Sequence, residues 1–219
     1  SPSGAYLIDK NLGTTIIDPN PDIIGDPNSD FTMSFINNFS FKGISLNFLI
    51  DWRQGGDMYS TTTGSLTLRG QLPSTENREA VRVIPGVYGT TDTFEPVLDD
   101  QGGEIKNTTG ITAFDYYFSN GFGPYGADET NVYDITTIRL REVSLGYNLP
   151  KSLLSKTPLG SVRISLTGRN LWFKAPNLDP DINMDPEVLA EVASSNVQGF
   201  EYGATPTTRR YGFNVTLTF

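Results

Sequence analysis

The sequence predicts an all-β chain, a fragment of an antiparallel transmembrane β-barrel with long extracellular loops. Three observations support this fold class. Five segments of roughly ten residues alternate apolar and polar side chains, which is typical of strands with two different faces. Very short turns alternate with very long loops along the chain. Aromatic residues gather near the strand ends, as in the interfacial girdles of barrels: Trp52, Tyr147, Trp172, Phe173 and Tyr211.

The first two strands are predicted at residues 30–41 and 44–53. Lys42 and Gly43 separate them, and such a pair is typical of a tight hairpin turn. Mostly polar residues occupy the opposite face of both strands, so each strand has one apolar and one polar side. The apolar side consists of Phe31, Met33, Phe35, Phe39, Phe41, Ile44, Leu46, Phe48, Ile50 and Trp52.

Three further strands are predicted at residues 138–148, 161–173 and 210–219. Ile138 and Leu140 lie out of phase with Val143, which predicts a bulge near residues 141–142. A second shift in phase is expected near residues 169–170. The last strand alternates without interruption, with its apolar side formed by Tyr211, Phe213, Val215, Leu217 and Phe219.

Two long segments, 54–137 and 174–208, lack a sustained period and are predicted to be loops. Loops of this length in a compact domain usually have a function. In the first loop a short helix is expected around residues 74–81. In the second, Asp185 as N-cap, Pro186 as first helical residue and Glu187 in the first turn predict a helix start.

The chain is expected to be a fragment because a membrane-spanning sheet must close so that every backbone group is paired. Five strands are too few, since the smallest bacterial barrels have about eight. The alternative is a soluble or surface-attached β-sandwich that binds carbohydrate, with the apolar faces packed inward. The size of the loops and the aromatic strand ends favour the barrel.

Composition excludes most common enzyme sites. The chain has 219 residues with no Cys and no His, which removes thiolate nucleophiles, serine triads and the usual zinc ligands. Its 25 acidic residues exceed its 16 basic ones, a balance that argues against a nucleic-acid partner. We therefore expect a protein that is not an enzyme, and a glycan-degrading enzyme is the weakest alternative.

Several residues are candidates for individual sites. Four oxygen-bearing side chains at alternating positions suggest a weak calcium site, although the run lacks the glycine and bidentate glutamate of an EF-hand; no other cofactor is expected. Three loop aromatics are candidates to contact a ligand or partner, or else to pack the loop itself. Four arginines are expected to line the lumen and pair with acids such as Asp51 and Glu142, with an anionic-substrate path as the alternative. These sets are Asp179, Asp181, Asn183 and Asp185; Tyr116, Tyr117 and Phe118; and Arg139, Arg141, Arg163 and Arg169.

The sequence resembles the C-terminal part of SusC/RagA-type TonB-dependent transporters over nearly its whole length. The most specific combination is IRLREVSLGYNLP, then a GRNLW strand, a DPE loop and a last strand that ends on an aromatic. The resemblance implies the last ~5 strands of a plugged outer-membrane barrel with about 22 strands. It implies import of glycans or oligopeptides together with a SusD-like surface lipoprotein, in a Bacteroidetes-type bacterium.

The resemblance also implies roles for particular parts of the chain. The plug and the segment that contacts TonB-ExbB-ExbD are absent, so energy coupling is expected outside these residues. The two long loops are expected to form the extracellular surface, while the strands contact outer-membrane lipid. The last strand, with Tyr211, Phe213, Val215, Leu217 and Phe219, resembles the signal that the barrel-assembly machinery recognises by β-augmentation.

Overall fold

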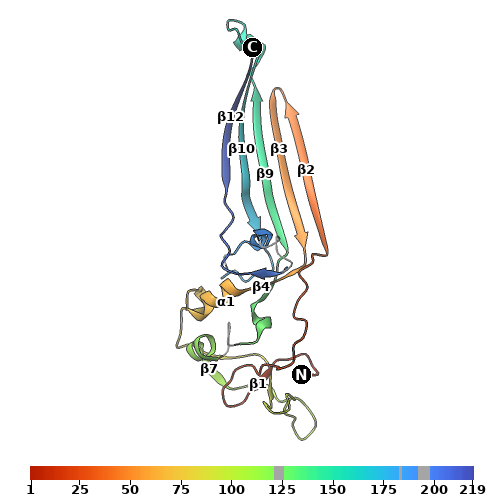
Figure 1. Ribbon diagram of the computed structural model, residues 1–219, viewed down its shortest axis with the longest axis vertical. Helices are drawn as coiled ribbons and strands as arrows, with labels where there is room; N and C mark the ends of the chain where they lie inside the picture. The colour runs from red at the N-terminus through yellow and green to blue at the C-terminus, as the bar shows by residue number, and fades with distance from the viewer. Residues whose placement is uncertain (121–125, 183, 192–197) are drawn as a thin grey trace.

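The computed structural model describes residues 1–120, 126–182, 184–191 and 198–219. These residues form two regions (Figure 1): a tall sheet of long strands, and a lobe of loops, short strands and short helices at one end of it. The N-terminal residue lies in the lobe, whereas the C-terminal residue lies at the far end of the sheet. The loops therefore gather at one end of the sheet and the turns at the other.

The sheet has five long strands in the order β12-β10-β9-β3-β2, and all neighbours are antiparallel. Each observed strand matches a predicted range to within one residue at either end. Among the described residues β2 and β12 each have a partner on one side only, so the sheet is open and not a closed barrel. The strands are β2 (Phe31–Phe41), β3 (Ile44–Gln54), β9 (Thr137–Asn148), β10 (Ser161–Lys174) and β12 (Arg210–Thr218).

The strand register gathers the apolar side chains on one face of the sheet. Leu46 is opposite Phe39 and Leu145, and Leu145 is opposite Leu166, which is opposite Phe213. This row remains exposed, with 58% of Phe39, 54% of Leu166 and 63% of Phe213 accessible. Within the described part of the chain no second sheet covers this face, and a β-sandwich would need one.

Two irregularities occur where the phase of the sequence predicts them. The register between β3 and β9 shifts next to Leu49 and leaves Arg141 as the extra residue, which confirms the predicted bulge. The register between β9 and β10 shifts between Arg169 and Trp172, where Asn170 has a positive φ of 51°. Both shifts lie in the half of the sheet nearer the lobe, and the charged residues described below lie beside them.

The turns at the far end of the sheet are short. Lys42 and Gly43 both have positive φ, 46° and 85°, as a two-residue hairpin turn of the mirror-image type requires. Glycine adopts this conformation without a steric penalty, so the Lys-Gly pair fixes the register of β2 on β3. The turn from β9 to β10 contains α3 (Lys151–Leu154), where Leu154 is buried.

The lobe contains most of the buried apolar side chains, among them Ile8, Met58, Val87 and Ile135. Three small sheets, β1-β6, β11-β4-β8 and β5-β7, join segments from different loops. Among the described residues no helix is long and apolar enough to cross a membrane. The elements are β1 (Leu7–Asp9), β4 (Asp57–Ser60), α1 (Thr61–Leu68), η1 (Pro73–Thr75), β5 (Val81–Val83), β6 (Val87–Gly89), β7 (Gly110–Thr112), α2 (Ala113–Asp115), η2 (Tyr116–Asn120), η4 (Asp128–Asn131), β8 (Val132–Asp134), η5 (Pro186–Glu191) and β11 (Phe200–Glu201).

The prediction of a helix around residues 74–81 is wrong. That segment contains the short turn η1 and then enters β5, whereas the eight-residue helix of this loop is α1, further upstream. Its sequence, TTTGSLTL, has no apolar period and offers no pattern to detect. The helix depends instead on its N-cap, where the Ser60 hydroxyl accepts a hydrogen bond from the Thr63 N–H at 3.1 Å, and on burial of Thr63 and Thr67.

Candidate functional site

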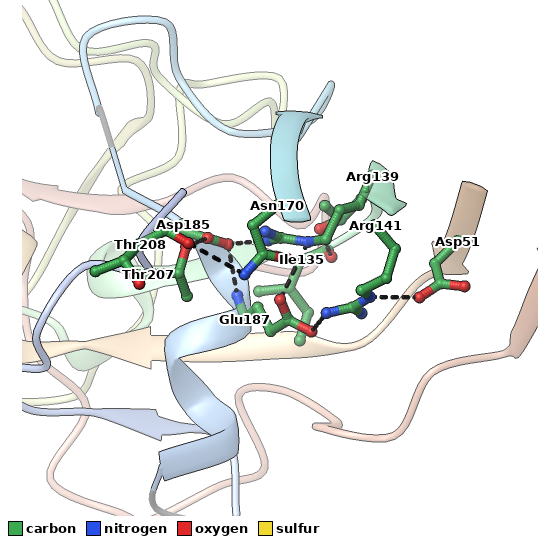
Figure 2. Close-up of polar contacts among 10 residues, drawn as sticks. Asp51, Ile135, Arg139, Arg141, Asn170, Asp185, Glu187, Thr207 and Thr208 are labelled. Atoms are coloured by element: carbon green, nitrogen blue, oxygen red, sulfur yellow. Dashed lines mark hydrogen bonds and ion pairs between the residues drawn. The ribbon is translucent and has the colours of Figure 1, made fainter. Parts of the chain in front are cut away.

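A cluster of charged side chains joins the sheet to the lobe on the polar face of the sheet. We define this charged junction as Asp51, Arg139, Arg141, Asp185 and Glu187. Asp51 comes from β3 and both arginines from β9, while the other two acids belong to the segment that enters η5 (Figure 2). The bulge at Arg141 and the position of Arg139 opposite Asp51 bring the basic groups together.

The acids of the second long loop point at the two arginines (Figure 2). Arg139 forms an ion pair with Asp185 and a second one with Glu187, whose Oε2 lies 3.1 Å from Arg139 Nε. Arg141 bridges Glu187, at 2.5 Å, and Asp51, at 2.7 Å. Glu187 therefore contacts both arginines, and the junction is a continuous network rather than separate pairs.

The centre of the junction is buried. Arg139 is 3% exposed and Asp185 6% exposed. The Arg139 guanidinium also lies 5.0 Å from the centroid of the Phe173 ring, on β10. The Thr207 hydroxyl donates to Asp185, and Asp185 in turn accepts the Glu187 N–H at 3.0 Å as the predicted N-cap. Buried charges need this degree of pairing, because each would otherwise lose its hydration without compensation.

A small cavity of about 90 Å³ lies beside the junction. Its lining consists of Asp51, Arg53, Ile135, Thr137, Arg139, Arg141, Pro186 and Glu187. Arg53 donates to the Pro27 carbonyl at 3.0 Å and so connects the segment before β2 to the end of β3. None of these groups is a nucleophile held beside a base, which is the arrangement that covalent catalysis requires. The ion pairs of the junction hold the second long loop against the sheet.

The remaining predicted arginines have different partners. Arg169 forms the expected pair with Glu142 at 3.2 Å, and the two side chains are 64% and 40% exposed. Among the described residues Arg163 forms no ion pair with an acid: it donates to the Ser45 hydroxyl at 2.8 Å and to the Asn148 side-chain oxygen at 3.4 Å. It lies over Gly146, where a Cβ atom would approach its Nη2 to 2.6 Å. The absence of a side chain at this position therefore makes room for the guanidinium across the sheet.

The described calcium candidates have different hydrogen-bond and ion-pair partners. Asp179 accepts the Asp181 N–H at 3.0 Å, which is an Asx-type turn, while Asp185 is paired with Arg139. Asn183 lies outside the described residues. In the part of the chain that the structure describes, no group of three or more acidic side chains is placed to hold a metal ion. Calcium binding by this loop stays a prediction.

The three loop aromatics pack within the lobe. The Tyr116 and Tyr117 rings lie 5.1 Å apart, and the Tyr117 hydroxyl accepts a hydrogen bond from Arg82 at 2.8 Å. Burial raises the pKa of Tyr116 to about 12. Phe118 packs against Phe114, with ring centroids 5.4 Å apart. These contacts hold the loop together, and the expected contact with a ligand or partner stays a prediction.

The proposed assembly strand, β12, lies at one edge of the sheet. Its apolar side chains are largely exposed, with 77% of Tyr211 and 85% of Phe219 accessible. Because only β10 pairs with it among the described strands, one row of backbone groups remains available for another strand. The geometry is that of an edge strand open to β-augmentation.

A second polar cluster in the lobe has no counterpart among the residues predicted from sequence. Glu201, 1% exposed, accepts hydrogen bonds from the Ser60 hydroxyl at 2.7 Å and the Thr62 hydroxyl at 2.6 Å. Burial raises the pKa of Glu201, but the hydrogen bonds from Thr62, Ala204 and Ser60 outweigh it and lower the pKa below the usual glutamate value. The carboxylate thus links β11 to the start of α1.

Comparison with known proteins shows which proteins the chain is similar to. No protein-family model matches the chain. TonB-dependent receptor P3 from Formosa agariphila is 27% identical over 220 residues, which cover all of this chain and 19% of the receptor. TonB-dependent receptor P26 from the same organism is 24% identical over 219 residues, or 99% of this chain and 20% of the receptor. The chain thus spans about a fifth of the length of these relatives.

Solved structures show the same fold. The RagAB peptide importer in its closed-closed state matches 98% of this chain with a TM-score of 0.58 and 18% identity, over 22% of that structure's chain. The open-open state matches 98% with a TM-score of 0.53 and 16% identity, over 20% of its chain. The sequence matches and the shared fold confirm the predicted resemblance: the chain is similar in sequence to one segment of TonB-dependent receptors and shares its fold with the matching part of the RagAB structures.

Proposed function

We propose that the chain is part of a TonB-dependent transporter of the cell outer membrane, and that its five-stranded sheet forms part of the barrel wall. The observation that supports this most directly is the exposed apolar face of the sheet, from Phe39 on β2 to Phe213 on β12. Exposed apolar surface of this extent is costly in water and favourable against lipid. The polar face then lines a wet lumen.

The dimensions of the strands suit this role. The 11 residues of β3 span roughly 36 Å at about 3.3 Å per residue. Tilted by about 45°, such a strand covers about 25 Å along the membrane normal, which is the height of the apolar band of outer-membrane barrels. We propose that the free edges of β2 and β12 pair with strands outside these residues, in a plugged barrel of about 22 strands.

In this orientation the lobe lies outside the cell and the short turns face the periplasm. We propose that the charged junction holds the second long loop against the lumenal face at the external mouth. A SusD-like lipoprotein would meet this surface, and the cargo would be glycans or oligopeptides. TonB-ExbB-ExbD would act through the part of the receptor that these residues do not include.

We also propose that β12 is the strand that the barrel-assembly machinery recognises, because it combines an open edge with an alternating apolar face that ends on Phe219. No catalytic step is assigned to any residue. The sandwich module that binds carbohydrate has no specific observation in its favour, since the described residues contain no second sheet against the apolar face.

Fractionation and uptake measurements on the native protein test the proposal. We expect a polypeptide several times longer than 219 residues, found in the outer membrane, soluble only in detergent, and with heat-modifiable migration on gels. Deleting its gene should abolish uptake of one class of oligomeric nutrient. A native protein that stays monomeric in plain buffer, or that cleaves polysaccharide, would contradict the proposal.

A further inference from the structure

A cleft of about 340 Å³ lies in the lobe, away from the charged junction. Its size falls within the range of roughly 300–1,000 Å³ that is typical of small-ligand sites. Three parts of the chain form it: the segment before β2, the small sheet β11-β4-β8, and η4. The lining includes Ile24, Pro27, Asp57, Tyr59, Asp128, Val132 and Phe200.

Carboxylates give this cleft its charge. Asp57 and Asp128 both line it, and its described lining contains no lysine or arginine. Asp57 Oδ2 accepts the Asp26 N–H at 2.9 Å, and Asp128 Oδ1 accepts the Tyr59 hydroxyl at 3.1 Å. Each bond uses only part of the acceptor capacity of a carboxylate, which has two oxygens and about four lone-pair sites. The cleft therefore favours a cation.

Aromatic and aliphatic side chains form the rest of the wall. The Tyr59 and Phe200 rings lie 5.6 Å apart at an interplanar angle of 49°, and half of Phe200 is exposed. Ring faces attract cations, and the neighbouring Ile24, Pro27 and Val132 offer apolar surface. An aliphatic stem with a cationic head matches both parts of this lining, because the stem packs on apolar surface while the head meets the carboxylates.

We propose that this cleft binds the lysine or arginine side chain of a peptide. The proposal rests on the proposed function, because it names the cargo chemistry that the external lobe selects. Asp57 and Asp128 bind the ammonium or guanidinium group, while Tyr59 and Phe200 contact the stem. A neutral side chain of the same length gains the apolar contacts alone, so the site discriminates by charge.

Binding of matched tripeptides to the full-length receptor in detergent tests this site. The probes are acetylated and amidated Ala-Lys-Ala, the same peptide with ε-acetyl-lysine, and the same peptide with norleucine. We expect the lysine peptide to bind about five- to tenfold more tightly than either neutral peptide. Equal affinity for the three peptides would overturn the proposal, and this comparison needs no variant.

A paired substitution locates the effect. Asp57→Asn with Asp128→Asn keeps an acceptor for the Asp26 N–H and the Tyr59 hydroxyl but removes two charges. This variant should lose the preference for lysine, whereas Asp92→Asn with Asp100→Asn, which removes two exposed charges of the same lobe outside the cleft, should retain it. Loss of the preference in both variants would assign it to the overall charge and not to the cleft.

The outcomes separate this site from the proposed function. If the receptor is needed for uptake but the lysine preference is absent, the cleft proposal fails and the transport proposal stands. If the preference is present and depends on Asp57 and Asp128, but deletion of the gene leaves all uptake unchanged, the cleft proposal stands and the transport proposal fails.

Discussion

The lobe of this protein buries its apolar side chains, whereas the sheet leaves most of its apolar side chains exposed. In the lobe, Ile8, Met58 and Ile135 are completely buried, and segments far apart in sequence pack together as in a soluble domain. In the sheet, regular alternation leaves side chains such as Leu166 and Phe213 exposed along a whole face. The lobe therefore excludes water from its apolar core, whereas the exposed apolar face of the sheet fits the lipid surrounding that we propose for it.

The charged junction lies where these two regions meet. Its arginines belong to the sheet and two of its acids to the loop, so the network determines how the second long loop sits on the polar face. We expect changes in the junction to affect both regions. Changes within either region should affect that region alone.

Arg139→Ala should have the largest effect. It leaves Asp185 buried without its cation, which costs about 3–5 kcal/mol for a buried pair. In the full-length receptor, we expect faster proteolysis and faster hydrogen exchange in segment 174–191, and lower thermal stability of the lobe. Arg169→Ala is the matched control, because its pair with Glu142 is exposed and should contribute less than about 1 kcal/mol. Equal effects of the two substitutions would contradict a special role for the junction.

Leu166→Arg tests the apolar face. A basic residue on the lipid side of a barrel costs about 2–4 kcal/mol near the membrane midplane. We expect less folded receptor in the outer membrane, measured as the heat-modifiable fraction on gels. Thr167→Arg, one residue along β10 and on the other face, should assemble almost normally. If Thr167→Arg were the more damaging substitution, the two faces would be assigned the wrong way round.

Glu201→Ala tests the lobe by itself. The substitution leaves the Ser60 and Thr62 donors without a buried acceptor, at a cost of about 1–3 kcal/mol. Hydrogen exchange of α1 should speed up while exchange in β9 and β10 stays unchanged. Glu95→Ala, an exposed carboxylate of the same lobe, provides the control. Faster exchange throughout the sheet would show that the two regions are more tightly coupled than this structure implies.

The pH dependence of α1 should be smaller but has a definite sign. The folded lobe lowers the pKa of Glu201, so ionised Glu201 stabilises the fold above the pKa of the unfolded chain. This contribution is lost as the pH falls through the lower, folded pKa. The backbone amides of α1 should therefore be less protected from hydrogen exchange at acidic pH. In the Glu201→Gln variant, the protection of the α1 amides should depend less on pH. If the variant and the unmodified protein have the same pH profile, ionised Glu201 does not stabilise the lobe.

The long strands could be predicted from sequence because their pattern is local. Alternation places the strands to within one residue, and its breaks near Arg141 and Asn170 locate both register shifts. The turn at Lys42 and Gly43 is equally local, since it depends on the residues of the turn itself. The structure of the lobe could not be obtained in this way. Its small sheets pair segments as distant as β4 and β11, and α1 has no apolar period.

The candidate site shows the same difference: contacts between neighbouring strands could be predicted from the sequence, and contacts between distant segments could not. Pairing of Arg141 with Asp51 and of Arg169 with Glu142 follows from strand neighbours and matches the expectation. The sequence predicts a helix start at Asp185 and Glu187, and the N-cap role of Asp185 is confirmed. Their contacts with Arg139, however, span 46 residues for Asp185 and 48 residues for Glu187. No local sequence pattern predicts a contact between residues so far apart. Glu201 was missed for the same reason, since its partners lie about 140 residues earlier.

The most direct test of the assigned faces is an accessibility scan along β10. These 219 residues contain no cysteine, so single cysteines from Val162 to Gly168 can each carry a spin label in a receptor whose other cysteines, outside these residues, have been replaced by serine. In the outer membrane, labels at Ile164 and Leu166 should collide with lipid-soluble oxygen, and labels at Ser165 and Thr167 with a water-soluble nickel complex. Equal access of the nickel complex to both sets would contradict a lipid-facing sheet.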